Sequence, residues 1–179
     1  MQNDIWETLR EKLPYKTTPE DTEKRKKIWE GFDVNGNGYI SLAETDKGMR
    51  DVLNLPQLFD LKPVLMRAFQ AAKKKLPSKN TYGDDYVSRA EFRYLLMYLR
   101  QYYEYWVAFD EIDKDDDRRI SYEEFCKAKS TMERWGIKGD SEALFKEADS
   151  DGHGMILFKE FVDWATRKGL DLDTDDDAL

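Results

Sequence analysis

Pairs of apolar residues recur along the chain at helical spacing, each pair just before a segment rich in Asp, Asn or Gly. The pairs stand four residues and one residue before these segments: Trp29 and Phe32, Phe109 and Ile112, and Phe145 and Ala148. A phenylalanine follows directly after the glutamate that ends three of the segments: Phe92, Phe125 and Phe161. Because residues three or four apart share one face of a helix, the pattern predicts helices that enter and leave short polar loops.

The first polar segment spans residues 33–44 and carries oxygen-bearing side chains at its positions 1, 3, 5, 9 and 12. Calcium takes about six to eight oxygen ligands, and this spacing is that of the twelve-residue EF-hand loop, which adds a carbonyl at position 7. Gly38 at position 6 allows the positive φ of the sharp bend. We predict a calcium site here, with Ser41 bound directly or through water. Its main ligands are Asp33, Asn35, Asn37, the Tyr39 carbonyl and Glu44.

Residues 113–124 repeat this pattern with four carboxylates, but Arg118 stands where glycine is expected. A non-glycine residue in the left-handed region costs about 1–2 kcal/mol. The four negative charges should more than offset that strain, so we predict that calcium binds this loop as well. The candidate ligands are Asp113, Asp115, Asp117, the Arg119 carbonyl and Glu124.

Residues 149–160 form a further copy, with Gly154 at position 6 and His153 at position 5. An imidazole nitrogen is a poor ligand for a hard cation. We therefore interpret His153 as a solvent-facing substitution that leaves position 5 to water, which predicts a functional but weakened site. Its candidate positions are Asp149, Asp151, His153, the Met155 carbonyl and Glu160.

A degenerate copy ends at Glu91 and begins at Asn80. Tyr82 at position 3 is too bulky to coordinate comfortably, and Asp85 stands in place of glycine. We predict no calcium here. The expected role is structural, with Val87 pairing with the equivalent residue of the first loop, Ile40.

The four loops begin at residues 33, 80, 113 and 149, which predicts two pairs of helix-loop-helix units. We expect an N-terminal lobe over residues 1–100 and a C-terminal lobe, with an acidic tail, over residues 101–179. Residues 54–63 are interpreted as a connector inserted in the first lobe. The fold class is all-α, with two EF-hand pairs, the second hand degenerate, packed into a compact molecule.

Two apolar segments outside the loops bear on this fold. Ile5, Trp6, Leu9 and Leu13 lie on one side of a short N-terminal helix stopped by Pro14, which either caps the core or holds a partner; capping is favoured. The tyrosine-rich segment between the second and third loops lacks glycine and proline. We expect it to pack against both lobes, since a long exposed helix would leave many aromatic side chains in water.

Composition narrows the function classes. The chain has 179 residues and a net charge of −8, which argues against nucleic-acid binding. A single cysteine, Cys126, and a single histidine exclude an intramolecular disulfide and a zinc site built on several such ligands. We expect no transmembrane segment, no signal peptide and an intracellular, cytoplasmic monomer.

The chain resembles the calflagins, the flagellar calcium-binding proteins of trypanosomatid protozoa. The resemblance rests on these features: the N-terminal helix with Trp6 and Pro14, the stretches Phe109–Asp113 and Ala143–Glu147, and Phe161 with Trp164 and Ala165. It implies calcium mainly in the third and fourth hands. The implied ligands are Asp113, Asp115, Asp117, Glu124, Asp149, Asp151 and Glu160.

The resemblance also implies a flagellar location, but the family's N-terminal acylation signal is absent. Position 2 is Gln2 where the family has glycine, and Cys126 lies after the third loop instead of near the N-terminus. Flagellar membrane attachment therefore does not follow from the motif.

Two functions remain open. The chain is either a calcium sensor that regulates a protein or membrane target, or a calcium buffer resembling the sarcoplasmic calcium-binding proteins. No catalytic Ser/His/Asp set or phosphate-binding glycine loop is visible, so we expect no enzyme. The basic clusters at residues 24–27 and 73–75 are candidates for an anionic membrane surface, and the alternative is a solvated helix face.

Overall fold

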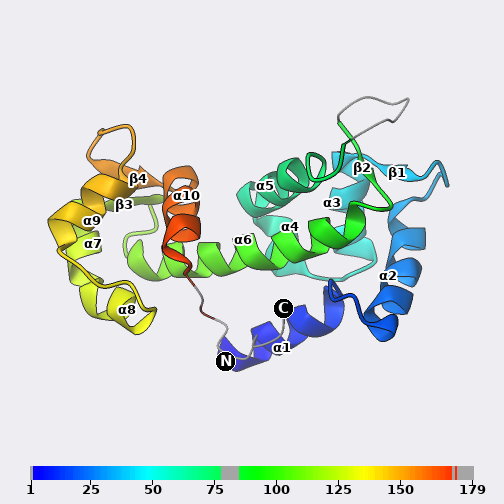
Figure 1. The fold of residues 1–179 in the computed structure, drawn as a ribbon, viewed down its shortest axis with the longest axis horizontal. Helices are drawn as coiled ribbons and strands as arrows, with labels where there is room; N and C mark the ends of the chain where they lie inside the picture. Colours follow the sequence, from blue (N-terminus) through cyan, green and yellow to red (C-terminus); the bar gives the residue numbers. More distant parts are fainter. Residues whose placement is uncertain (1, 78–84, 171, 173–179) are drawn as a thin grey trace. The chain divides into compact units, whose positions relative to one another are not determined.

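The computed structural model describes residues 2–77, 85–170 and 172, which form ten helices and four short strands (Figure 1). These elements divide into two compact units, Met1–Tyr103 and Glu104–Leu179, and each is described by itself. The predicted all-α EF-hand fold is confirmed, since each strand has only two or three residues. Packing of the two pairs into one compact molecule stays a prediction.

Unit 1 holds the first two helix-loop-helix units and an extra N-terminal helix. Its elements are α1 (Gln2–Lys12), α2 (Pro19–Phe32), β1 (Tyr39–Ile40), α3 (Leu42–Asp51), α4 (Pro56–Asp60), α5 (Lys62–Ala72), β2 (Val87–Ser88) and the first part of α6 (Phe92–Ile112). The predicted connector at residues 54–63 contains α4, whose first residue is Pro56.

Local sequence signals fix the helix ends of unit 1. The Thr18 hydroxyl accepts from the Asp21 amide at the start of α2, with Pro19 as the first helical residue. At the start of α3, Ser41 and Glu44 form a reciprocal capping box. The helix that leaves the first loop is therefore stabilised by the same glutamate that is predicted to bind the ion.

The two loops of unit 1 are joined by an antiparallel pair of strands. Ile40 pairs with Val87, and both side chains are fully buried. The predicted contact between the first loop and the degenerate second loop is thus confirmed.

A close approach of two helices sets the core of unit 1. The Phe92 ring lies 5.2 Å from the rings of both Trp29 and Phe32, edge to face. On the other side of Phe32, a Cβ built on Gly48 would stand only 2.6 Å from the ring carbons. Only a glycine at position 48 lets α3 pack this closely against α2.

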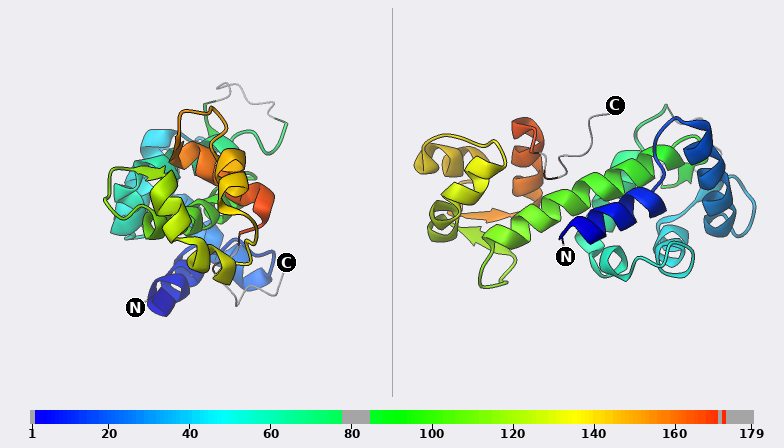
Figure 2. Two further views of the ribbon diagram at one scale, coloured as in Figure 1. Left: turned by 90° about the vertical axis from the view of Figure 1, so that its left-hand side faces the viewer. Right: turned by 90° about the horizontal axis from the view of Figure 1, so that it is seen from below.

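The N-terminal helix belongs to the core of unit 1. Trp6, Leu9 and Leu13 are buried, and the Trp6 ring meets Tyr103 of α6 at 5.7 Å. Figure 2 shows α1 lying beside α6. The predicted capping role is confirmed for these three side chains, while the side chain of Ile5 is outside the described part of the structure.

Unit 2 contains the last two helix-loop-helix units. Its elements are the second part of α6, β3 (Arg119–Ser121), α7 (Tyr122–Lys127), α8 (Lys129–Arg134), α9 (Ser141–Ala148), β4 (Met155–Leu157) and α10 (Phe158–Lys168). Ile120 pairs with Ile156 across β3 and β4, and both are fully buried. Gly169, in the left-handed conformation, ends α10.

Aromatic side chains fill the core of unit 2. The Phe161 ring lies 5.6 Å from Phe109 and 5.8 Å from Trp164, and Trp164 lies 5.7 Å from Phe125. These four side chains are buried. Phe109, Phe125 and Phe161 belong to the recurrent apolar pattern that predicted the helices, so for these three residues the pattern identified the core correctly.

Two further expectations concern the described parts only. Within them, no helix is long and apolar enough to cross a membrane. The acidic tail lies outside the described residues, apart from Leu172. So does the first half of the second loop, which includes Asn80, Tyr82 and Asp84.

Candidate metal centres

The first ligand of the third loop, Asp113, is buried at the C-terminal end of α6. Its Oδ2 accepts a hydrogen bond from the Arg118 amide at 2.9 Å. Its Oδ1 is buried and has no hydrogen-bond partner among the described residues. A buried carboxylate oxygen without a partner is costly unless a cation fills the space beside it.

Three carboxylates converge at this point. Oxygens of Asp113, Asp115 and Asp117 lie within 4.8 Å of one another. Burial, reinforced by the negative charges of Glu124 and Asp117, raises the pKa of Asp113 above its ordinary value. The loop therefore concentrates negative charge that a divalent cation would neutralise.

Glu124 is held in place by the start of the helix that follows the loop. Its Oε2 accepts from the Ser121 amide at 2.9 Å and from the Ser121 hydroxyl at 2.7 Å. Its Oε1 accepts from the Lys114 amide at 3.0 Å, across the loop. Burial alone would raise the pKa of Glu124, but these hydrogen bonds hold it below its usual value and keep the group ionised.

Two backbone positions of the third loop are strained. Arg118 has a φ of 67°, so the predicted left-handed conformation at this non-glycine residue is confirmed. Asp116 also lies in the left-handed region, with a φ of 58°. The sequence reading missed Asp116, although glycine at this position in the first and fourth loops, Gly36 and Gly152, was an available signal.

The fourth loop repeats the arrangement. Asp149 Oδ2 accepts from the Gly154 amide at 2.9 Å, while its Oδ1 is buried and without a partner among the described residues. Oxygens of Asp149, Asp151 and Glu160 lie within 4.8 Å of one another. Glu160 accepts from the Asp151 amide through Oε1 at 3.2 Å and from the Leu157 amide through Oε2 at 2.9 Å.

His153 points to solvent, with its side chain 80% exposed. Its Nδ1 lies 2.8 Å from Oδ1 of Asp151. The hydrogen bond to Asp151 raises the pKa of His153, and the same contact lowers the pKa of Asp151. The imidazole therefore competes with calcium for Oδ1 of Asp151. The sequence did not indicate this competition.

The position-7 residues of these loops lie in the short sheet. Arg119 pairs with Leu157, and Met155 pairs with Ser121. One antiparallel pair of strands therefore carries residues of both loops and joins the two candidate sites.

The first loop has the same outline but a different charge. Both carboxylate oxygens of Asp33 accept backbone amides, Oδ1 from Asn37 at 3.1 Å and Oδ2 from Gly38 at 2.9 Å. The side-chain amide nitrogen of Asn35 donates to Glu44 Oε1 at 3.0 Å. The Asn37 side-chain oxygen accepts from the amide of Tyr39, whose carbonyl is the position-7 candidate. The candidate ligands of this loop include two carboxylates, Asp33 and Glu44. None of the side-chain oxygens of residues 33–44 is both buried and without a hydrogen-bond partner.

The second loop keeps the hydrogen bonds of its second half, which leads into the exiting helix. Oε2 of Glu91 accepts from the Ser88 amide at 2.9 Å and from the Ser88 hydroxyl at 3.0 Å, as in the first and third loops. Asp85 forms an ion pair with Lys73 at 3.0 Å.

Comparison with known proteins agrees with this geometry. Residues 9–99, just over half of the chain, match the model of the FCaBP EF-hand domain, and residues 137–168 match that of an EF-hand domain pair. A flagellar calcium-binding protein of Trypanosoma cruzi is 35% identical over 97% of this chain and 84% of its own length. The chain belongs to the flagellar calcium-binding protein family.

Other relatives of the family agree. Flagellar calcium-binding protein TB-17 of Trypanosoma brucei brucei is 32% identical over 96% of this chain and 75% of its own length. A solved structure of a homolog of programmed cell death 6 protein from Leishmania major Friedlin aligns over 87% of this chain and 78% of its own, with a TM-score of 0.41 and 16% identity. The resemblance to the calflagins is confirmed.

As in other EF-hand proteins of this family, the ion is calcium. The side chains that converge in the third and fourth loops are all carboxylates, and their oxygens suit a hard cation. The unpartnered oxygens of Asp113 and Asp149 show where positive charge is lacking. The assignment of each individual ligand, including those of the first loop, stays a prediction.

Proposed function

We propose that this member of the flagellar calcium-binding protein family is a monomeric calcium sensor. Its C-terminal pair of hands binds two calcium ions first, and the first hand binds a third more weakly. Ion binding then changes an exposed surface that regulates a protein or membrane target. The role is not enzymatic, in keeping with relatives that are named as calcium-binding proteins.

The observation that carries the sensor proposal is a surface pocket beside the ligands of unit 2. It has a volume of about 640 Å³ and includes Tyr122, Phe145, Asp149 and Gly152. Tyr122 directly follows Ser121 of the third loop and is 46% exposed, while Asp149 and Gly152 belong to the fourth loop. A change at either loop therefore alters the wall of a pocket that combines the rings of Tyr122 and Phe145 with the charged side chains of Glu142 and Lys146, and calcium sensors present target surfaces through changes of this kind.

The alternative function, a soluble intracellular calcium buffer, has one observation in its favour. Phe109, Phe125, Phe161 and Trp164 form an interlocked ring cluster under both loops. Opening such a core exposes large aromatic area and is costly. A buffer would bind calcium with this cluster unchanged.

Calorimetric calcium titration of the full chain tests the ion sites. We expect three ions, with Glu124→Gln and Glu160→Gln each removing one, because an amide cannot supply two anionic oxygens. The matched control is Glu91→Gln, at the same position of the degenerate hand, which should leave the stoichiometry unchanged. A stoichiometry of two favours the third and fourth hands alone, and zero ends the proposal.

A dye that fluoresces on apolar surface separates sensor from buffer. The sensor proposal expects calcium to increase dye binding in the wild type, and expects less increase in Tyr122→Ser. A calcium-loaded protein that binds no more dye than the calcium-free protein would support the buffer instead.

The names of the relatives support a flagellar location for this intracellular protein, which fluorescence microscopy of the tagged protein in its own cell tests. The basic clusters give limited support for a membrane target, since Lys24 pairs with Glu20 at 2.9 Å and Lys26 with Glu23 at 3.6 Å. Lys73 is only 10% exposed and pairs with Asp85. Failure to sediment with phosphatidylserine vesicles, with or without calcium, would eliminate the membrane surface and leave a protein target.

A further inference from the structure

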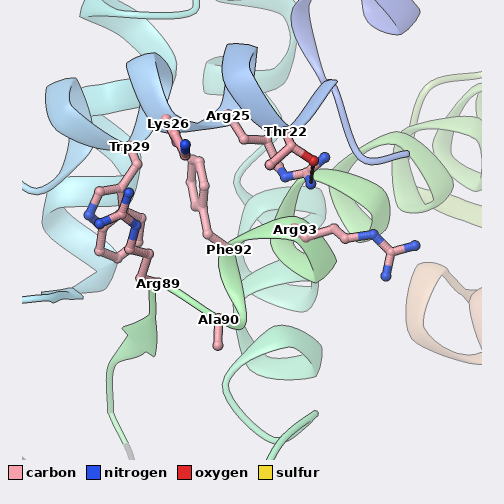
Figure 3. Close-up of a pocket in the computed structure, with 8 residues that line it drawn as sticks. All are labelled: Thr22, Arg25, Lys26, Trp29, Arg89, Ala90, Phe92 and Arg93. Atoms are coloured by element: carbon pink, nitrogen blue, oxygen red, sulfur yellow. Dashed lines mark hydrogen bonds between the residues drawn. The ribbon is translucent and has the colours of Figure 1, made fainter. Parts of the chain in front are cut away.

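A cationic pocket of about 260 Å³ lies in unit 1, away from every calcium loop (Figure 3). Its walls come from α2 on one side and from the first turn of α6, with the residues just before it, on the other. Four basic side chains line it over two aromatic residues that are themselves buried: Arg25, Lys26, Arg89 and Arg93, over Trp29 and Phe92. In a chain with a net charge of −8, this concentration of positive charge is unexpected.

The arginines of this pocket have little counter-charge: Asp21 attracts Arg25 without forming an ion pair with it. Among the residues that the structure describes, none of Arg25, Arg89 and Arg93 forms an ion pair with a carboxylate, and Lys26 has only Glu23 at 3.6 Å. The nearby carboxylate of Asp21 is engaged by the Lys16 amide at 2.9 Å. Among these groups, Arg25 and Arg93 lie near enough to repel one another, and an anion beside them would relieve that repulsion.

Two of the guanidinium groups are held in fixed positions by neutral partners. Arg25 donates through Nη1 to the Pro14 carbonyl at 3.0 Å and to the Lys16 carbonyl at 2.6 Å. It also donates through Nη2 to the Thr22 hydroxyl at 3.2 Å, the contact drawn in Figure 3. Arg93 donates through Nε to the carbonyl of Tyr15 at 2.6 Å.

These hydrogen bonds orient the groups without neutralising them. A guanidinium has five N–H donors, so each arginine keeps free donors after these contacts. Burial and the positive charge of Arg93 lower the pKa of Arg25, which shows the electrostatic cost that remains. Fixed, partly desolvated donors lose little entropy when they bind a ligand.

We propose that this pocket binds a phosphate group that carries more than one negative charge, presented by a small soluble phosphate or by the headgroup of a phosphomonoester lipid. Planar guanidinium forks match the oxygens of phosphate and bind them in pairs. At about 260 Å³ the pocket is slightly smaller than typical drug-sized ligand sites and is large enough for a phosphoryl group. The site is independent of calcium binding and adds a second ligand to the protein.

The pocket also touches the segment that anchors the N-terminal helix. Arg25 and Arg93, which would bind the phosphate, are the residues that hold the carbonyls of Pro14, Tyr15 and Lys16. A bound phosphate would relieve the repulsion between these two arginines and tighten this anchor. Ligand binding should therefore protect the backbone amides of α1 from hydrogen exchange.

The test titrates calcium-free full-length protein with sodium pyrophosphate and with inorganic phosphate, followed by NMR of the backbone amides. We expect saturable shifts that are largest at residues 22–29 and 89–93 and extend to the anchor at residues 14–16, with dissociation constants in or below the millimolar range. Arg89→Gln should weaken binding about tenfold, the effect of losing one charge-assisted hydrogen bond. Arg89→Glu should abolish it.

Arg89 is the position of choice because it is exposed and its side chain makes no described hydrogen bond or ion pair, so both variants should fold. The matched control is Lys138→Gln, which removes one exposed positive charge from unit 2 and should leave binding unchanged. Calcium stoichiometry should be the same in all of these proteins.

Vesicles identify the source of the phosphate. A lipid headgroup is assigned if the protein binds phosphatidylcholine vesicles that contain phosphatidic acid, does not bind vesicles with phosphatidylserine, and loses binding in Arg89→Glu. A soluble phosphate is assigned if the protein binds only the free anions. Absence of binding in every arm, or equal weakening by Arg89→Gln and Lys138→Gln, overturns the proposal.

Discussion

Replacing Arg118 by glycine should make the third loop both more stable and a better calcium site. Arg118 and Asp116 are held in the left-handed region, with φ of 67° and 58°. The corresponding residues of the fourth loop are glycines, Gly154 and Gly152, with φ of 83° and 71°. The third loop therefore carries strain at two positions where the fourth loop carries none.

The size of the effect follows from two opposing contributions. The left-handed conformation costs a non-glycine residue about 1–2 kcal/mol. Glycine itself lowers the free energy of unfolding by about 0.5–1 kcal/mol, because it gives the unfolded chain more conformational freedom. This loss offsets part of the strain that is relieved. The expected net gain for Arg118→Gly is about 0.5–1 kcal/mol in the free energy of unfolding. The hydrogen bond from the amide of residue 118 to Asp113 is unaffected, since it is made by the backbone.

A matched variant separates strain from charge. Asp116→Gly relieves the same kind of strain, by less, because aspartate tolerates the left-handed region better than arginine. It removes a negative charge, whereas Arg118→Gly removes a positive one. A unit charge about one Debye length from a divalent ion contributes roughly 0.5 kcal/mol. Calcium affinity of the third loop should therefore rise about twofold in Arg118→Gly and fall about twofold in Asp116→Gly.

Urea unfolding of the calcium-free proteins measures the strain, and calorimetric titration measures the affinity. Both variants should be at least as stable as the wild type, with opposite changes in affinity. A calcium-free Arg118→Gly protein less stable than the wild type would refute the strain argument. Affinity changes of the same sign in the two variants would refute the charge argument.

Two further variants test the fourth loop and the core of unit 1. His153→Asn should strengthen calcium binding at the fourth loop severalfold in a calorimetric titration, because it frees the Asp151 oxygen and supplies another at position 5; an unchanged dissociation constant would contradict this role. Gly48→Ala should lower the free energy of unfolding by about 1–2 kcal/mol, since the clash with Phe32 exceeds the gain in helix propensity. A urea midpoint at or above that of the wild type would show that α2 and α3 can move apart.

The positions of the four hands could be read from the sequence because the coordination of one ion fixes the spacing of its ligands. The same rule placed Ile40 opposite Val87 and required a left-handed residue at Arg118, and the structure agrees on both. Both expectations follow from distances within a single loop or between equivalent positions of paired loops.

What the sequence did not reveal depends on packing between distant segments. The close approach at Gly48 arises only once α3 lies against the Phe32 ring. The cationic pocket joins Arg25 to Arg89 and Arg93, which are more than sixty residues away in the chain. In the sequence Arg25 belongs to the basic cluster at residues 24–27, but only the fold brings it together with Arg89 and Arg93.

The second half of the loop, which leads into the exiting helix, makes the same hydrogen bond in all four hands and so does not distinguish them. A glutamate at position 12 accepts the position-9 amide in all four hands, including the degenerate one, where Glu91 binds Ser88. This contact stabilises the first turn of the exiting helix whether or not an ion is present.

Calcium preference must therefore be set by the entering half of the loop. Positions 1, 3 and 5 carry three carboxylates in the third hand, two in the fourth and one in the first. Only Asp113 and Asp149 leave a buried oxygen unpartnered among the described residues of the loops. Since attraction for a divalent ion grows with ligand charge, the order of affinity should be third, fourth, then first. A first hand that fills before the other two would show that loop preorganisation outweighs charge.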